Sequence, residues 1–279
     1  MKNINLFWYS IYKFRKNPKI LSKHFVRKLL GIEKENYGDL LSKYLVEKIS
    51  KKKTKWYNPQ EINPEKNYMA IGSILNYANE KSYIWGSGII DRKHSVICDQ
   101  VFAVRGPLTR ARLLDLEINC PEIYGDPALL LPEYYNPKIK KKVKIGIVPH
   151  MVDYRRAQDK FLENSEIRII NLATSNIENT TRSILECEAI ISSSLHGLIV
   201  AHAYNIPAVW VKFSNDLYGD DIKFYDYLAS VKLKDYSPQM IDEITNTGQL
   251  ERILGKVNNL PDVLYLSEIK KGLMKSCPF

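Results

Sequence analysis

Residues 189–212, AIISSSLHGLIVAHAYNIPAVWVK, constrain the fold more than any other stretch of the chain. The apolar run 189–191 predicts a buried strand, and three serines then form a turn. Residues 195–204 carry leucine and isoleucine at helical spacing, and a second apolar strand is predicted at 208–211. The stretch therefore reads as strand–helix–strand, with a polar turn at the carboxyl edge of its first strand. Open α/β sheets bind their ligands at this edge.

The turn at the start of this helix contains a candidate catalytic residue, His196, with Ser193, Ser194 and Gly197 beside it. Unpaired backbone N–H groups and the positive end of the helix dipole favour an anion there. An imidazole next to a bound anion is suited to proton transfer, and the alternative is a structural histidine beneath a capping serine. His202 lies about 120° around the helix from His196, so we expect it to serve packing.

Similar polar turns follow predicted strands elsewhere in the chain. In chain order they hold Asn36 and Asp39, Ser73, Ser87, Arg105, Asp126, and His150 with Asp153. An arginine on such a turn can hold a phosphate or carboxylate through two hydrogen bonds. Structural interpretations remain open for several of these residues. Asn36, Asp39 and Asp126 could cap helices. Arg105 could lie on the surface, and His150 could have a structural role.

The length of the chain and one linker predict two domains. A chain of 279 residues exceeds one ordinary core, and residues 136–142, NPKIKKK, separate two strand patterns. Strands alternate with helices on both sides of this linker, so we expect an α/β protein with two Rossmann-like doubly wound domains facing across a cleft. The predicted division is a basic aromatic arm at 1–30, domains at 31–137 and 143–235, and a helical tail at 236–279 that could pack back on the first domain.

The basic charge is concentrated in the arm. Residues 1–30 contain eight Lys or Arg and no Asp or Glu, whereas the whole chain has a net charge of +10. Because aromatic residues are interleaved with these charges, the arm could lie on an anionic membrane surface, or it could pack on its own domain. No nucleic-acid recognition motif accompanies the charge. No apolar run approaches the roughly 20 residues that span a bilayer, and no signal-peptide core is present. We therefore expect a cytoplasmic protein, with peripheral contact at the inner face of the membrane as one alternative.

The four cysteines, Cys98, Cys120, Cys187 and Cys277, are widely spaced and form no Cys-x-x-Cys pair. Reduced thiols are the simplest interpretation. No ligand set has recognisable metal spacing, so we expect no metal site and a metal-independent reaction.

Taken in order, these turns resemble the polysaccharide pyruvyl transferase family. The stretches that carry the resemblance are 36–39 (NYGD), 71–73 (IGS), 85–88 (WGSG), 105–109 (RGPLT), 125–128 (GDPA), 146–150 (GIVPH) with Asp153, and 192–200 (SSSLHGLIV) with Pro207. The resemblance implies a GT-B-like architecture. It also implies transfer of pyruvate from phosphoenolpyruvate to a sugar of a surface or capsular polysaccharide, or of its lipid-linked precursor. The product would be a pyruvate ketal, with phosphate released and no cofactor beyond the donor.

The resemblance carries the family's proposed catalytic histidine over to His196, and its RGP motif places Arg105. We hypothesise that His196 is the general acid/base and that Arg105 and the Ser193–Ser194 turn hold the donor's anionic groups. His150 would then assist binding or proton transfer. Some relatives carry a basic residue two positions before the catalytic histidine, where this chain has Ser194. Donor binding then depends more on Arg105, on His150 or on a group that the sequence does not identify.

Two other classes of function remain open. A nucleotide-sugar-dependent glycosyltransferase could use the same two-domain plan, and Asp220-Asp221 is the acidic pair that most resembles its metal-binding step. A non-catalytic scaffold could use the basic arm to associate with a membrane. Stabilisation by phosphoenolpyruvate or by a nucleotide sugar would separate the two enzymes, and deletion of residues 1–30 would test the scaffold.

Overall fold

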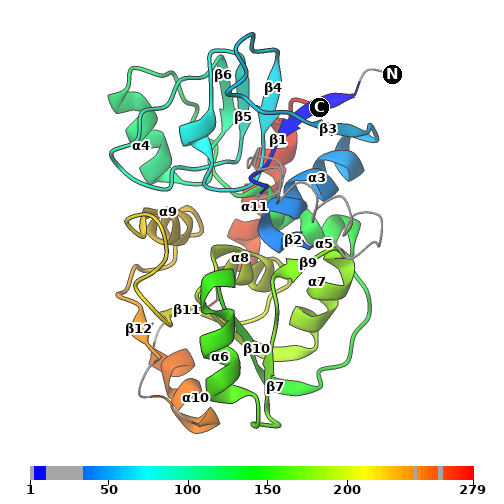
Figure 1. Cartoon of the computed structure of the whole chain (residues 1–279), viewed down its shortest axis with the longest axis vertical. Coiled ribbons are helices and arrows are strands. Elements are labelled where there is room, and N and C mark those ends of the chain that lie inside the picture. Colours follow the sequence, from blue (N-terminus) through cyan, green and yellow to red (C-terminus); the bar gives the residue numbers. More distant parts are fainter. Residues whose placement is uncertain (1–2, 11–33, 242–243, 245, 257–259) are drawn as a thin grey trace, which may run out of the picture.

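The structure is a computed structural model that describes residues 3–10, 34–241, 244, 246–256 and 260–279 (Figure 1). Most of the predicted membrane-binding arm, residues 11–30, lies outside the described residues. Within them, no helix is both long enough and apolar enough to cross a lipid bilayer.

Two five-stranded sheets, each built of parallel strands, form the framework (Figure 1). In spatial order, the first contains β3 (Thr54–Trp56), β1 (Ile4–Phe7), β4 (Asn67–Met69), β5 (Ser82–Trp85) and β6 (Gln100–Ala103). The second contains β12 (Gln239–Met240), β11 (Ala208–Lys212), β10 (Cys187–Ser192), β7 (Val143–Val148) and β8 (Ile167–Ile169). The predicted α/β class is confirmed, and both sheets have the parallel pairing of Rossmann-like units.

Helices connect and cover these strands. They are α3 (Tyr37–Ser50), α4 (Pro107–Asp115), α5 (Leu131–Tyr134), α6 (Tyr154–Phe161), α7 (Ile177–Leu185), α8 (Leu195–Ala203), α9 (Ile222–Ser230), α10 (Thr247–Lys256) and α11 (Val263–Lys275). Short 3₁₀ helices are η1 (Leu75–Tyr77), η2 (Pro127–Leu130) and η3 (Met151–Asp153). A small antiparallel pair, β2 (Glu35–Asn36) with β9 (Ala173–Thr174), joins the start of α3 to the second half of the chain.

The predicted strand–helix–strand unit is present as β10, α8 and β11, with β10 and β11 paired in parallel. Its helix is almost entirely buried, and His202 packs inside as expected, with Nδ1 2.8 Å from the Tyr227 hydroxyl. Gly197 lets the first turn approach the sheet, because a Cβ there would lie 2.2 Å from the Ser192 Oγ. Gly197 therefore serves close packing beneath the turn.

The beginning of the predicted arm belongs to the first sheet, so the division at residue 31 is wrong for residues 3–10. Strand β1 pairs with both β3 and β4, and the Leu6 and Phe7 side chains are fully buried. Strand β3 lies beside β1 at the edge of the same sheet. A four-residue strand whose apolar side chains face both covered sides of a sheet gives no alternating pattern, and this is why the sequence did not reveal it.

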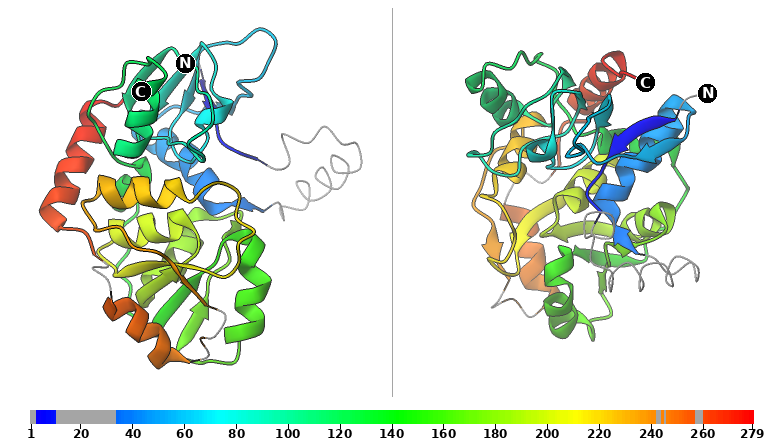
Figure 2. Two further views of the ribbon diagram at one scale, coloured as in Figure 1. Left: turned by 90° about the vertical axis from the view of Figure 1, so that its left-hand side faces the viewer. Right: turned by 45° about the horizontal axis from the view of Figure 1, so that its top comes forward.

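Two segments late in the chain cross from the second sheet to the first (Figure 2). Helix α11 packs on the first half: the Trp85 indole donates a hydrogen bond to the Leu273 carbonyl at 2.9 Å, and Phe279 contacts the same indole edge-to-face. Helix α9 packs against α4. A single cluster of buried apolar side chains extends from Leu6 in the first sheet to Ile190 and Trp210 in the second. The two sheets therefore share a continuous core.

Candidate functional site

A cavity of about 390 Å³ lies where polar turns from both halves of the chain converge. Residues on its wall include Asn36 and Asp39 at the start of α3, Ser73 after β4, His150 after β7, and Ser194 and His196 at the start of α8. The sequence predicted all six as site residues, and the fold brings them to one place. This convergence follows from parallel strands, whose carboxyl ends share one edge of a sheet.

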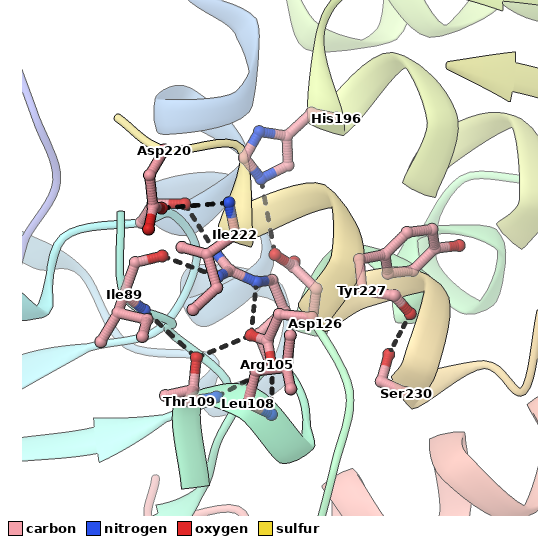
Figure 3. A network of polar contacts seen from close by, with 12 residues as sticks. Ile89, Arg105, Leu108, Thr109, Asp126, His196, Asp220, Ile222, Tyr227 and Ser230 are labelled. Carbon is pink, nitrogen blue, oxygen red and sulfur yellow. Dashed lines mark hydrogen bonds and ion pairs between the residues drawn. The ribbon is translucent and has the colours of Figure 1, made fainter. Parts of the chain in front are cut away.

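His196 is held in the cavity wall by an acidic partner beneath it (Figure 3). The imidazole is 12% exposed, and its Nε2 lies 3.5 Å from Oδ2 of Asp126, which is fully buried. Both atoms are buried, and neither has a hydrogen-bond partner among the described residues. Asp126 also accepts a hydrogen bond from the Ala128 N–H through Oδ1. Asp126 therefore caps η2 with Oδ1 and places Oδ2 beside the His196 ring.

The other side of the His196 ring rests on the start of α3. A Cβ at Gly38 would lie 2.2 Å from His196 Nδ1, so only glycine leaves room for the imidazole. Asn36 caps this helix by accepting a hydrogen bond from the Gly38 N–H at 2.9 Å. The imidazole is therefore held between Asp126, on the side of Nε2, and the start of α3, on the side of Nδ1.

The first turn of α8 supplies anion-binding groups. Ser194 is the N-cap residue, yet its side chain makes no capping hydrogen bond, so its hydroxyl remains available at the cavity wall. The first-turn N–H groups of a helix have no intrahelical acceptor, and they lie at the positive end of its dipole. This end of the cavity is therefore suited to a phosphate or carboxylate.

His150 is a neutral hydrogen-bonding group in the free protein. Burial and, to a smaller extent, the positive charge of Lys223 lower its pKa to about 4, against the opposing effect of Asp153. Its Nδ1 accepts a hydrogen bond from the Val152 N–H, so Nε2 carries the ring proton. His150 therefore offers a donor to an anion in the cavity.

Two of the predicted binding residues lie beneath the cavity and support His150. Ser193 accepts a hydrogen bond from the His150 N–H at 2.9 Å and donates one to the buried carboxylate of Asp153 at 3.2 Å. Asp153 also accepts from the Ser214 hydroxyl at 2.6 Å. These bonds tie the ends of β7 and β10 together, which fixes the position of His150.

Asp39 is a carboxylate in an environment that favours its neutral form. Burial and, to a smaller extent, the charge of Glu35 raise its pKa to about 7, against the opposing effects of His196 and Lys223. The carboxyl group lines the cavity and makes no hydrogen bond within the described residues. An acid whose pKa lies near neutrality can give or accept a proton at physiological pH.

Arg105 does not line the cavity, although the sequence placed it among the anion-binding residues. It is fully buried, with Nε 3.0 Å from Oδ2 of Asp226 in a buried ion pair. Its two terminal nitrogens donate to the Ser73 hydroxyl at 2.6 Å and to the Ile89 carbonyl at 2.7 Å (Figure 3). Gly88 makes room for the guanidinium, because a Cβ there would lie 2.3 Å from Cζ. Arg105 therefore reaches the cavity only through Ser73, since its charge is compensated inside the protein.

Ser87 also lies outside the cavity wall. Its side chain is fully buried, and its Oγ has no hydrogen-bond partner among the described residues. Its carbonyl accepts the Arg105 N–H at 3.2 Å, so the turn after β5 supports the turn after β6.

The sequence analysis missed Lys223, which lines the cavity from the first turn of α9. Burial and, to a smaller extent, the charge of Arg105 lower its pKa to about 8, against the opposing charges of Asp221 and Asp39. A local signal was present: a lysine in the first turn of a predicted helix is unfavourable beside the positive end of the dipole. Such a position suggests that an anion is bound nearby.

The part of the chain that the structure describes contains no cluster of three or more His, Cys, Asp or Glu side chains arranged to hold a metal ion. The acidic pair of the glycosyltransferase alternative is engaged by cations: Asp220 with Arg92 at 2.8 Å, and Asp221 with Lys212.

Comparison with known proteins agrees with the motifs. The family model for polysaccharide pyruvyl transferase matches residues 19–215. A relative from Acanthamoeba polyphaga mimivirus, the uncharacterized protein L143, is 32% identical over 203 residues, which are 70% of this chain and 70% of the relative. The matched range includes β10, the start of α8 and the cavity residues named above, with the exception of Lys223. The chain belongs to the polysaccharide pyruvyl transferase family.

Proposed function

We propose that the protein transfers the pyruvyl group of phosphoenolpyruvate to two hydroxyls of a sugar, forming a ketal and releasing phosphate. The acceptor belongs to a surface or capsular polysaccharide or to its lipid-linked precursor. The observation that carries this proposal is the cavity itself, where His196 and its buried partner Asp126 adjoin groups suited to a small anion. We also propose the GT-B-like arrangement of two Rossmann-like domains for this protein, because the cavity lies between two parallel sheets.

The proton balance of this reaction matches the groups present. One sugar hydroxyl adds to C2 of the donor while its methylene carbon takes up a proton, and a second hydroxyl then displaces phosphate. Two hydroxyl protons are lost: one balances the proton gained by the new methyl group, and the other leaves with phosphate. His196 is the proposed acid/base for the methylene or hydroxyl proton, with the Asp126 carboxylate 3.5 Å from its Nε2. Asp39, in the same cavity, is suited to the other transfer because its pKa lies near 7.

We place the acceptor sugar at the end of the cavity that is lined by tyrosines. Tyr9, Tyr77 and Tyr218 all contribute to the wall, with the rings of Tyr9 and Tyr77 6.1 Å apart. Aromatic faces pack against the C–H surfaces of sugar rings, and tyrosine adds a hydroxyl for hydrogen bonding. Asn76 lines the same cavity, and its Oδ1 is buried without a partner among the described residues, which suits it to accept from a sugar hydroxyl.

The reaction is proposed to need no metal and no cofactor beyond the donor, and to take place in the cytoplasm. Treatment with a chelator followed by gel filtration should leave turnover unchanged. A loss of activity that Mg²⁺ or Mn²⁺ restores would refute the metal-independent scheme.

The direct test is incubation with phosphoenolpyruvate and a panel of sugar acceptors. The expected result is release of inorganic phosphate together with a pyruvate mass increment on the acceptor. Thermal unfolding separates the glycosyltransferase alternative, because a ligand that binds the folded state raises its melting temperature. Phosphoenolpyruvate should stabilise the protein, and stabilisation by UDP- or GDP-sugars instead would contradict the proposal.

A further inference from the structure

The donor's phosphate needs a cation in the cavity, and the predicted one is used elsewhere. Arg105 is buried, paired with Asp226 and hydrogen-bonded through Nε and both terminal nitrogens. Turning it into the cavity would leave the Asp226 carboxylate buried and unpaired, which is strongly unfavourable. The position two residues before His196 holds the neutral Ser194. A different residue must therefore supply the positive charge.

Lys223 is a cation of the cavity wall that has no ion-pair partner within 4.0 Å among the described residues. It makes no ion pair or hydrogen bond within the described residues, and its ammonium lies 5.4 Å from the centroid of the Phe224 ring. Asp221, the nearest acid on the same segment, is paired with Lys212. A buried cation without a partner is costly, and a bound anion would relieve that cost.

Lys223 also faces the other polar groups of the cavity. Its charge affects the pKa of His150, which follows β7, and of Asp39, in the first turn of α3. Both of these residues line the cavity with Lys223. An anion between Lys223 and the start of α8 would meet an ammonium, the His150 Nε2–H and the first-turn N–H groups of a helix. These are three kinds of donor that commonly bind phosphate.

The geometry points to Lys223 as the residue that binds the phosphate group of the donor. This inference rests on the proposed function for the identity of the donor. Arg105 acts indirectly as a positioning residue, because its partner Asp226 lies on the same helix as Lys223.

The test measures binding, not turnover, on the full chain. Inorganic phosphate, phosphoenolpyruvate and pyruvate are titrated at fixed ionic strength into the wild type and the Lys223→Met, Lys223→Arg and Lys34→Met variants. Loss of a charged hydrogen bond to phosphate should weaken phosphate and phosphoenolpyruvate binding by about tenfold to a hundredfold in Lys223→Met. Pyruvate binding should not change. Lys223→Arg keeps the charge and should retain most of the affinity.

Lys34→Met is the matched control, since Lys34 also lines the cavity but is exposed to solvent. Its loss should change phosphate affinity by less than about threefold, because solvent screens an exposed charge. The inference is overturned if Lys223→Met binds phosphate as the wild type does, if Lys34→Met loses as much affinity, if only pyruvate binding falls, or if wild type binds no phosphate. Failure of the proposed function looks different: the wild type would bind phosphate through Lys223 but release none from phosphoenolpyruvate with any acceptor.

Discussion

Replacing Asp226 by asparagine should destabilise the protein by about 3–5 kcal/mol, because it leaves the Arg105 charge buried without its counter-charge. Both side chains of this ion pair are 0% exposed. The Asp226 carboxylate accepts four hydrogen bonds. Oδ1 receives the N–H groups of Leu108 and Thr109, each at 2.9 Å, and Oδ2 receives Arg105 Nε at 3.0 Å and the Thr109 hydroxyl at 2.6 Å. Asp226, which lies on α9, thereby caps the N-terminal end of α4.

The asparagine can satisfy only part of this arrangement. Its oxygen can still accept the two backbone N–H groups of α4, but its NH₂ then faces the Nε–H of Arg105, a donor against a donor. The Thr109 hydroxyl can rotate and accept, whereas the guanidinium cannot lose its proton. The loss is therefore dominated by an uncompensated buried charge, and it is a large part of a total stability of about 5–15 kcal/mol.

Urea unfolding followed by far-UV circular dichroism measures this loss, with Glu166→Gln as the control. The Lys144–Glu166 pair is an exposed counterpart, at 52% and 45% side-chain exposure, so its removal should cost less than about 1 kcal/mol. Combining Asp226→Asn with Arg105→Met removes both charges while the asparagine oxygen still accepts the two N–H groups of α4, so this double variant should cost less than Asp226→Asn alone. The reasoning fails if Asp226→Asn unfolds at the same urea concentration as Glu166→Gln.

Three further outcomes test the cavity. His196→Ala should lower kcat/KM by about 10²- to 10⁴-fold, and retention of more than about a tenth of wild-type activity would contradict its acid/base role. Asp126→Asn should lower kcat with little effect on phosphate affinity, since Asp126 contacts His196 and not the anion; equal losses in both would indicate a structural role. Asp39→Asn should be as stable as the wild type at pH 3 and more stable at pH 8. The reason is that the folded pKa near 7 exceeds the unfolded value of 3.8, so the wild type loses stability as pH rises from about 4 to 7. Equal urea midpoints at pH 8 would refute this.

The sequence predicted the site through local signals. Each polar turn was visible because it follows a strand or precedes a helix, and parallel strands place such turns at one edge. One carboxylate oxygen of Asp126 caps η2, as the capping interpretation predicted, and the other lies 3.5 Å from Nε2 of His196. His150, Ser194 and His196 reached the cavity wall for the same reason.

Local sequence signals do not show which side chains become buried or which residues far apart in the chain contact each other. Nothing near Arg105 in the sequence indicates that Asp226, 121 positions away, would neutralise it inside the protein. The strand β1 was hidden for a related reason, since its partners β3 and β4 lie about fifty to sixty residues later in the chain. Whether a basic residue on a turn binds a ligand or pairs with an acidic side chain of the protein depends on contacts between distant parts of the chain. Such contacts cannot be deduced from the local pattern of a single sequence.

The contact between α4 and α9 explains why Arg105, on a turn of a type that often binds ligands, here joins the two halves of the chain. Gly106 brings the two helices together, because a Cβ there would lie 2.1 Å from the Asp226 carbonyl oxygen, and Gly88 makes the corresponding room for Arg105. Both glycines therefore serve the junction between the halves of the chain. Helix α9 follows β11 of the second sheet but is fixed to the first half by this junction, and its first turn presents Lys223 to the cavity. A change at the buried pair should therefore affect phosphate binding without touching the ligand, and Asp226→Asn should weaken it even under conditions where the protein remains folded.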